Sequence, residues 1–215
     1  MEYGISHTLP IYSGGLGVLA GDIVKAAADQ NRNFIALGIL WGEGYFVQDI
    51  DEEGRQVERY VATPRSRLRP TGIEVHIDVG GKSIPVTAWR VLHMGSVELI
   101  LLEPVQEEDR WITQRLYGGN NYDRVAQEIL LGVGGVRALR ALGLPVEVYH
   151  FNEGHALFAG LELMREAIAD GCSMEQAQER VKAKTIFTTH TPVPAGNEVH
   201  PIELLQQVGV GLGTF

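Results

Sequence analysis

The 215-residue sequence has little cysteine, few lysines and no long apolar run. Its one cysteine, Cys172, cannot form a disulfide within the chain, which fits a reducing compartment. The formal net charge of −9 argues against non-specific nucleic-acid binding, because such binding needs clustered lysine and arginine. No apolar run is long enough to span a bilayer, and no secretory signal pattern opens the chain. We therefore expect a cytoplasmic protein that binds neither membranes nor nucleic acid.

What the sequence does contain is an alternation of helix and strand patterns. Apolar residues at helical spacing predict a helix that ends near Gln30, and the continuous apolar run 34–40 predicts a strand buried on both faces. Residues 44–104 hold short β-rich runs between turn signals, which predicts an antiparallel insertion beside the main sheet. The expected elements after Tyr122 are a long helix, the strand VEVYHF, helices after His155 and from Ser173, the strand TIFTT and a helix after Pro201. This pattern predicts an α/β fold with a mostly parallel sheet.

The stretch SGGLGVLAGD, residues 13–22, places glycines directly before the first predicted helix. Glycine allows positive φ and close approach to the backbone, and a helix N-terminus attracts anions, most often phosphate. GLGVLA fits the dinucleotide pattern G-x-G-x-x-G/A, but Pro10 argues against the strand that this pattern requires before it. No Lys-Ser or Lys-Thr pair follows, as a Walker A loop would need. A purely structural glycine turn remains an open alternative.

Polar residues follow two of the predicted strands, in the stretches HFNEGH and TTHTPVPAGNE. In open α/β sheets, ligands bind just outside the C-terminal ends of the strands. Carboxylate, amide and imidazole groups are suited to binding the hydroxyl groups of a sugar. The side chains that we expect to gather at this edge, beside the glycine loop, are Asn152, Glu153, His155 and His190.

Three alternative roles remain open for these polar residues. Asn152 and Glu153 could cap the helix that follows them, and His190 could be a buried histidine with satisfied hydrogen bonds. His150, Glu153 and His155 could instead bind a metal ion, although their spacing differs from that of the helical H-E-x-x-H motif. The sequence has no second cysteine that would support a zinc site, so we expect no metal.

The Met1-Glu2-Tyr3 opening, SGGLGVLAGD, RLYGG, FNEGHALF and THTPVPAG occur in this order. Together they resemble the α-glucan (glycogen, starch or maltodextrin) phosphorylase family, in its shorter bacterial and archaeal branch. The resemblance extends from Met1 to about Glu203. Glycogen and starch synthases share the GGLG loop on a similar fold, but a lysine typically stands just before their glycines. Tyr12 and Ser13 occupy that place here, which favours a phosphorylase over a sugar-nucleotide-dependent synthase.

The resemblance implies the N-terminal Rossmann-like domain of a B-type glycosyltransferase fold. It also implies reversible phosphorolysis of an α-1,4-glucan to glucose 1-phosphate, with pyridoxal phosphate serving as a proton relay through its 5′-phosphate. The implied catalytic residues are His190, which matches a histidine that contacts the glucosyl unit, and Glu2, which matches a glutamate near the catalytic cleft. Glu153 stands where the animal and plant enzymes have aspartate. The implied glucan- and phosphate-binding residues are Gly14, Gly15, Leu16, Asn120, Asn121, Asn152, Glu153 and His155.

The resemblance also implies that part of the enzyme lies outside these 215 residues. The family's cofactor lysine is in a second α/β domain, and none of the four lysines here follows its attachment pattern. We therefore expect residues 1–215 to be part of an N-terminal domain, inactive alone, whose active site forms against the C-terminal domain. The expected partners are an α-glucan, inorganic phosphate or glucose 1-phosphate, the C-terminal domain and a second copy of the chain. The alternatives are a glucan synthase and a free-standing glucan-binding module.

Overall fold

The computed structural model describes residues 1–190 and 199–210, so residues 191–198 of the stretch TTHTPVPAGNE lie outside the described residues. The chain divides into two compact units. The first contains residues 1–71 and 88–119, and the second contains residues 72–87 and the chain from residue 120 onward. One long β-hairpin, residues 68–91, is therefore divided between the units. Its far half, residues 72–87 around the turn, belongs to the second unit, and the rest of the hairpin belongs to the first.

A helix and then a strand open the first unit, as the sequence predicts. The helix α1 spans Gly14–Asp29 and is capped at Gln30, and it buries one face at helical spacing. Unlike a dinucleotide-binding loop, its glycines are not preceded by a strand, because residues 1–13 form only an isolated bridge between Ser6 and Leu9. The other elements are β1 (Ile35–Ile39), β2 (Val47–Ile50), β3 (Gln56–Arg59), β4 (Leu68–Val79), β5 (Lys82–Val91), β6 (Glu98–Pro104) and the 3₁₀ helix η1 (Glu107–Thr113).

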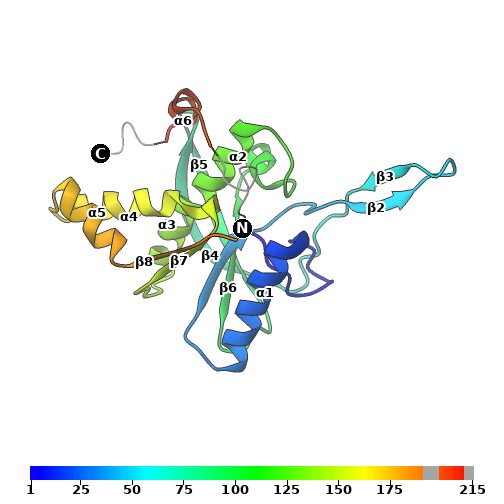
Figure 1. Ribbon diagram of the computed structural model, residues 1–215, viewed down its shortest axis with the longest axis horizontal. Coiled ribbons are helices and arrows are strands. Elements are labelled where there is room, and N and C mark those ends of the chain that lie inside the picture. The colour runs from blue at the N-terminus through cyan, green and yellow to red at the C-terminus, as the bar shows by residue number, and fades with distance from the viewer. Residues whose placement is uncertain (191–198, 211–215) are drawn as a thin grey trace. The chain divides into compact units, whose positions relative to one another are not determined.

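The main sheet has four strands in the order β1-β6-β5-β4 (Figure 1). β1 and β6 pair in parallel, from Ile35 opposite Glu98 to Ile39 opposite Leu102. β4 and β5 are joined by a two-residue turn, Gly80-Gly81, so this pair is antiparallel. The sheet is therefore mixed, with one parallel pair extended by a hairpin.

This arrangement corrects one expectation from the sequence. Residues 98–104 were predicted to belong to the β-rich insertion, yet β6 lies beside β1 within the main sheet. The physical reason is in the run ELILLEP, whose residues after Glu98 are all buried. A strand whose two faces are both buried lies inside a sheet, with a neighbouring strand along each edge. For β6 these neighbours are β1 and β5. The main sheet is thus mixed, and three strands that the sequence assigned to the insertion, β4, β5 and β6, belong to it.

β2 and β3 form a separate two-stranded antiparallel hairpin that extends away from the rest of its unit (Figure 1). All eight of its strand residues are exposed. At its base, Tyr45 stacks on Phe46 with ring centroids 4.4 Å apart, and the guanidinium of Arg115 lies 3.8 Å from the ring centroid of Tyr60. Aromatic and cation–π contacts therefore anchor the base of the hairpin, while its tip is solvated.

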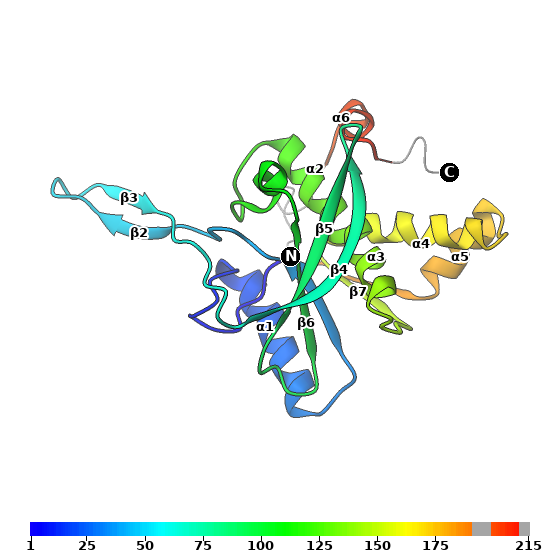
Figure 2. The same cartoon turned by 180° about the vertical axis from the view of Figure 1, so that it is seen from behind.

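The second unit contains the predicted helices and two short strands (Figure 2). β7 and β8 pair in parallel as a sheet of their own, with Tyr149 opposite Thr185. The helix expected from Ser173 is present, and Ser173 and Gln176 form the capping box that the sequence predicts. The elements are α2 (Asn121–Ile129), the π-helical turn η2 (Leu130–Gly134), α3 (Gly135–Ala141), β7 (Tyr149–Asn152), the 3₁₀ turn η3 (Gly154–Ala156), α4 (Phe158–Ala169), α5 (Met174–Lys182), β8 (Thr185–Thr188) and α6 (Ile202–Val208).

The long helix predicted after Tyr122 is interrupted by the π turn η2. A Cβ atom at Gly132 would lie 2.6 Å from the backbone nitrogen of Ala159, so only glycine fits there. The close approach of η2 to the start of α4 therefore depends on a residue without a side chain. A π turn widens the helix by one residue, which the periodicity of the sequence does not reveal.

A buried carboxylate joins α3 to α4. The side chain of Glu162 is 2% exposed, and it accepts hydrogen bonds from Arg137 at 2.9 and 3.0 Å and from Arg165 at 2.7 and 3.0 Å. Burial raises the pKa of the Glu162 carboxyl, but the two guanidinium groups outweigh this effect and lower it below its usual value. Arg137 also donates to the carbonyl oxygen of His76 at 2.7 Å, which ties the far half of the β4–β5 hairpin to the helices of its own unit.

Across residues 1–190 and 199–210, every helix is too short or too polar to cross a membrane. The cytoplasmic location expected from the sequence stays a prediction.

Candidate functional site

In the first unit, the buried Glu2 forms a hydrogen bond with the residue that precedes α1. The residue is 1% exposed, and its Oε2 accepts a hydrogen bond from the backbone nitrogen of Ser13 at 2.5 Å. Its Oε1 accepts a hydrogen bond from the hydroxyl of Tyr117, whose side chain is half exposed. Glu2 thus fixes both the residue before the glycine loop and a tyrosine that faces solvent. A buried carboxylate of this kind positions its neighbours through charge-assisted hydrogen bonds.

The glycines of the loop differ in what surrounds them. A Cβ atom at Gly14 or Gly15 would meet no atom within 4 Å, and Gly14 has a φ of +67°, which other residues rarely adopt. At Gly17, by contrast, a Cβ would lie 2.6 Å from Cβ of Tyr12 and 2.8 Å from Oε2 of Glu2. A Cβ at Gly21 would collide with the carbonyl oxygen of Gly4. The structural alternative therefore explains Gly17 and Gly21 by their contacts and Gly14 by its positive φ, while it leaves Gly15 unexplained.

The first turn of α1 carries the electrostatic features of an anion site. The side chain of Ser13 makes no capping hydrogen bond to the helix, and Gly14 and Gly15 are exposed. Leu16 is half-buried on the same turn. Helix N–H groups without a side-chain cap remain available to a ligand at the positive end of the helix dipole.

In the second unit, Glu153 ties the end of β7 to the end of β8. Glu153 is 5% exposed, and its Oε1 accepts a hydrogen bond from the backbone nitrogen of His190 at 2.5 Å. Its Oε2 accepts from Oγ1 of Thr189 at 3.2 Å, and its own backbone nitrogen donates to the carbonyl oxygen of Thr188 at 2.9 Å. Its side chain makes no capping hydrogen bond to the following turn. The capping alternative for Glu153 is therefore wrong.

The backbone of Glu153 is also strained. Its φ is +61° and its ψ is −171°, a region that is essentially confined to glycine. Such a conformation costs roughly 1–3 kcal/mol and persists only where the surroundings enforce it. Here three hydrogen bonds to residues 188–190 hold the strained residue in place. Strain of this kind concentrates at functional sites, so it marks this strand end as a candidate.

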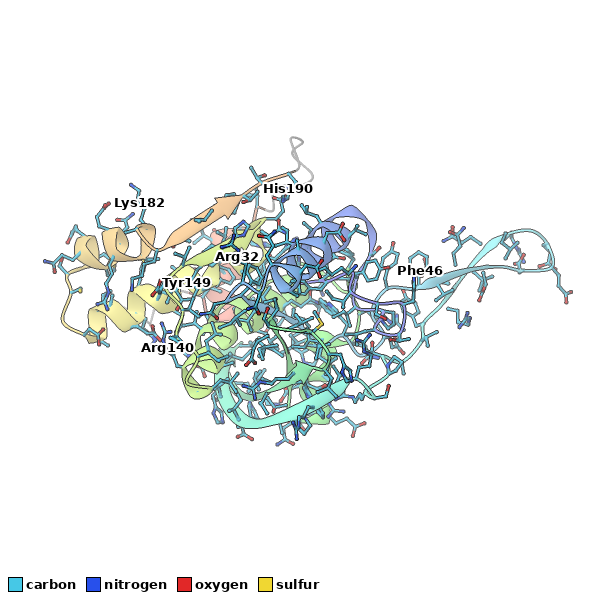
Figure 3. All side chains as sticks on the ribbon, turned by 90° about the horizontal axis from the view of Figure 1, so that it is seen from below. Arg32, Phe46, Arg140, Tyr149, Lys182 and His190 are labelled. Atoms are coloured by element: carbon cyan, nitrogen blue, oxygen red, sulfur yellow. The ribbon has the colours of Figure 1, made fainter. Side chains whose placement is uncertain are left out.

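His190, labelled in Figure 3, is exposed, and its ring is held by a hydrogen bond with Asn152. Nε2 of His190 lies 2.7 Å from Oδ1 of Asn152. An amide oxygen can only accept, so Nε2 of His190 is the donor in this hydrogen bond. Two alternatives are thereby wrong: His190 is not a buried histidine, and the Asn152 side chain holds a histidine rather than capping a helix.

The other two histidines of the HFNEGH stretch have different partners. His155 is 9% exposed, and its Nδ1 lies 3.0 Å from Nη2 of Arg124, which links η3 to α2. His150 is exposed, and its Nε2 lies 2.7 Å from Oγ1 of Thr188. In the part of the chain that the structure describes, no three His, Cys, Asp or Glu side chains are arranged to hold a metal ion. The structure thus gives the metal alternative no support.

Asn120 and Asn121 lie at the start of α2. The side chain of Asn120 accepts hydrogen bonds from the backbone nitrogens of Tyr122 at 2.8 Å and Asp123 at 3.2 Å. Oδ2 of Asp123 accepts in return from the backbone nitrogen of Asn120 at 2.6 Å, which completes a capping box. Asn120 therefore has a structural role, and a substrate contact for either asparagine stays a prediction.

Replacing Asn120 with alanine should lower the free energy of unfolding by about 1 kcal/mol, because two helix N–H groups lose their acceptor. Asn121→Ala is the matched control, since Asn121 is the first helical residue and supplies no cap. Urea unfolding of both variants would measure the difference. An equal loss of stability in the two variants would contradict the assignment of Asn120 as the cap.

The predicted site residues thus fall into two groups, one in each unit. Glu2, Gly14, Gly15 and Leu16 belong to the first unit, and the remaining predicted residues belong to the second. Their gathering at one edge beside the glycine loop stays a prediction.

The sequence analysis missed two residues that hydrogen-bond to the predicted site residues, Tyr117 and Thr189. Tyr117 stands in RLYGG with a φ of +60°, and its position before two glycines is the only signal in the sequence.

Comparison with known proteins gives three informative relatives. Glycogen phosphorylase of Mycobacterium tuberculosis (strain H37Rv) is 42% identical over 96% of this chain and 26% of its own length. Maltodextrin phosphorylase of Thermococcus litoralis is 41% identical over 94% of this chain and 26% of its own length. The predicted resemblance to α-glucan phosphorylases is confirmed. Glycogen phosphorylase of Aquifex aeolicus is 32% identical over 96% of this chain and 31% of its own length. The chain thus spans about a quarter to a third of the length of these phosphorylases.

Two further comparisons concern the fold. No family model matches the chain. The catalytic domain of starch synthase IV from Arabidopsis thaliana, solved with ADP and acarbose, superimposes with a TM-score of 0.53 over 86% of this chain and 31% of that domain. The sequence identity is 14%, so this likeness shows the fold alone. It agrees with the α/β class expected of a phosphorylase-like chain.

Proposed function

We propose that this chain is part of an α-1,4-glucan phosphorylase, which releases glucose 1-phosphate from the non-reducing end of a glucan. The observation that carries the proposal is the 42% identity to a glycogen phosphorylase across 96% of the chain. The similarity includes almost the whole chain, so it extends over both groups of predicted site residues. The strained Glu153 and the exposed His190 add a physical reason to place function at the ends of β7 and β8.

We infer that the chain is part of the N-terminal domain of a B-type glycosyltransferase. The fold likeness to a starch synthase catalytic domain supports this architecture. The relatives are three to four times longer than the matched region, which supports a larger polypeptide with a second domain. Glucan, phosphate and the second domain are then the partners of this chain.

His190 is proposed to contact a hydroxyl group of the glucosyl unit. Its ring is exposed, and the hydrogen bond to Asn152 fixes its orientation. Glu153 acts on the same residue through the backbone, because its carboxylate accepts from the nitrogen of His190. Glu153 is therefore a positioning residue in this proposal. A histidine held from both sides loses little conformational freedom when a sugar binds.

The first turn of α1 is proposed to receive the phosphate, either inorganic or on glucose 1-phosphate. Gly14 and Gly15 leave the backbone uncovered, and the helix dipole favours a negative charge at this place. Glu2 supports the loop through Ser13 and is buried, so a direct contact between Glu2 and the reacting atoms would need the carboxylate to become accessible. We therefore propose that Glu2 positions the loop and Tyr117.

The lysines of this chain do not fit covalent attachment of pyridoxal phosphate. Lys25, Lys82, Lys182 and Lys184 are all exposed, whereas a lysine that forms a Schiff base needs a desolvated setting to be deprotonated. Lys25 also donates to the carbonyl oxygen of Gly4 at 3.1 Å and lies 3.7 Å from Asp22. The cofactor, which supplies a proton-relay phosphate in the family, is accordingly assigned to the second domain of the proposed enzyme.

A direct test uses the complete polypeptide that contains this chain. Maltodextrin and inorganic phosphate should yield glucose 1-phosphate, and ADP-glucose or UDP-glucose should give no elongation of the glucan. Coupled detection of glucose 1-phosphate and chromatography of the glucan would measure the two reactions. Elongation that depends on the sugar nucleotide, without phosphorolysis, would replace the proposal with the synthase alternative. Glucan binding with neither reaction would favour the binding-module alternative.

A further inference from the structure

A cavity of about 70 Å³ lies within the second unit, among α3, α4, α5 and the start of β7. Its position differs from that of the candidate site. Tyr149 is the first residue of β7 and Lys184 directly precedes β8, whereas Asn152 is the last residue of β7 and His190 follows the end of β8. The polar residues that line it are Arg140, Tyr149, Glu166, Asp170, Arg180 and Lys184. The rest of the lining is apolar.

The lining of the cavity has an excess of positive charge. Three cationic and two anionic side chains leave one net positive charge. Arg140 is paired with Glu166, to which its Nε and Nη2 donate at 3.1 and 2.8 Å. Nη1 of Arg180 makes two long contacts, at 3.5 Å with Oδ2 of Asp170 and at 3.9 Å with Sγ of Cys172, and Lys184 has no side-chain partner among the described residues. Two cations beside the cavity therefore retain donors for a ligand.

A buried polar group lines the same cavity and is not satisfied. Tyr149 is 8% exposed, and within the described residues its hydroxyl makes no hydrogen bond of ordinary geometry, although the Arg140 guanidinium is close enough to interact with it. It lies beside Arg140, whose pKa is raised chiefly by the hydrogen bonds to Glu166 and also by Tyr149 (Figure 3). Leaving a buried hydroxyl without a partner costs roughly 1–3 kcal/mol. Such a group at the wall of a cavity indicates that the cavity normally holds a polar partner.

We propose that this cavity binds a tetrahedral oxyanion, the phosphate group, with Lys184 and Arg180 as its cations and Tyr149 as a neutral donor. The volume admits roughly two water molecules at about 30 Å³ each, or one oxyanion of that size. Lysine and arginine are the usual phosphate ligands in proteins, and a phenol O–H donates well to an anion. The site is separate from the proposed phosphate position at α1 and belongs to a different unit.

The test measures phosphate binding calorimetrically in the complete protein at constant ionic strength. Lys184→Met and Tyr149→Phe should each raise the Kd of one phosphate about fivefold, the size of one partly exposed charge pair or hydrogen bond. Lys182→Met is the matched control. Lys182 is exposed at the end of α5, two residues before Lys184, and lies apart from Arg140 and Tyr149 (Figure 3). Its Kd should equal that of the wild type. The difference between the two lysine variants isolates this cavity from phosphate binding elsewhere.

Tyr149→Phe also separates a ligand from ordered water. If the variant gains stability while phosphate binding stays unchanged, the cavity holds water only and the proposal is overturned. Equal phosphate affinity in the Lys184→Met and Lys182→Met variants would overturn it as well. A second titration with glucose 1-phosphate identifies the source of the phosphate group. If Lys184→Met weakens the binding of both ligands, the site takes sugar phosphates as well as free phosphate. If it weakens the binding of inorganic phosphate alone, the site takes only the free ion.

Discussion

His190→Ala should lower kcat/KM of the complete enzyme by about 100-fold or more, the scale on which one well-placed polar contact in a transition state is lost. The ring is exposed to a ligand, yet Asn152 and the backbone bond to Glu153 hold it in one orientation. Losing a contact that strengthens as charge develops on the sugar lowers kcat as well as kcat/KM. Steady-state phosphorolysis of maltodextrin at varied phosphate concentration would measure both constants.

His150→Ala is the matched control for His190. His150 is also an exposed histidine near the same strand ends, and its hydrogen bond goes to the hydroxyl of Thr188. Its replacement should leave kcat/KM close to that of the wild type. A loss confined to KM in the His190→Ala enzyme would reduce this residue to one that binds substrate and transition state equally. Similar losses in both histidine variants would remove the special role of His190.

Gly15→Val should reduce activity by about 100-fold, comparable to a misplacement of about 1 Å at a reacting centre, while the free energy of unfolding changes little. A side chain at this position meets nothing in the structure, so it would extend into the space above the first turn of α1. It would then block the approach of a phosphate to the backbone nitrogens. Activity assays and urea unfolding of the same preparation would measure the two effects together.

Gly17→Ala provides the opposite case. Its Cβ would press on Tyr12 and on the carboxylate of Glu2, so overpacking should cost roughly 1–3 kcal/mol of stability. The two glycine variants should therefore separate function from folding within one loop. If Gly15→Val lost stability in proportion to its activity, the whole loop would be a structural turn and the phosphate proposal for α1 would be wrong.

Helix boundaries were largely predictable because local signals fix them. The cap at Ser173 and the glycines at the start of α1 each act within a few residues of the chain. The place of β6 was not predictable, because a run buried on both faces shows that a strand is central without showing which strand pairs with it. The π turn at η2 depends on the approach of α4 to Gly132, a contact between residues far apart in the sequence.

The candidate site was predictable in composition but not in the division of roles. The sequence placed Asn152, Glu153 and His190 at strand ends, and the structure joins these three through hydrogen bonds. The sequence could not show that Glu153 is buried and strained while His190 is exposed, because both properties arise from the pairing of β7 with β8. His155 fits the same motif, yet its partner is Arg124, a contact that no spacing in the sequence indicates.

The most direct test of the central claim compares glucose 1-phosphate release by the complete polypeptide with that of residues 1–215 alone. Both proteins would receive maltodextrin, phosphate and pyridoxal phosphate under identical conditions. The complete polypeptide should release glucose 1-phosphate and show an absorbance from covalently bound cofactor. Residues 1–215 should show neither, because their four lysines are exposed and do not fit the cofactor. Robust phosphorolysis by residues 1–215 alone, or none by the complete polypeptide, would contradict the account.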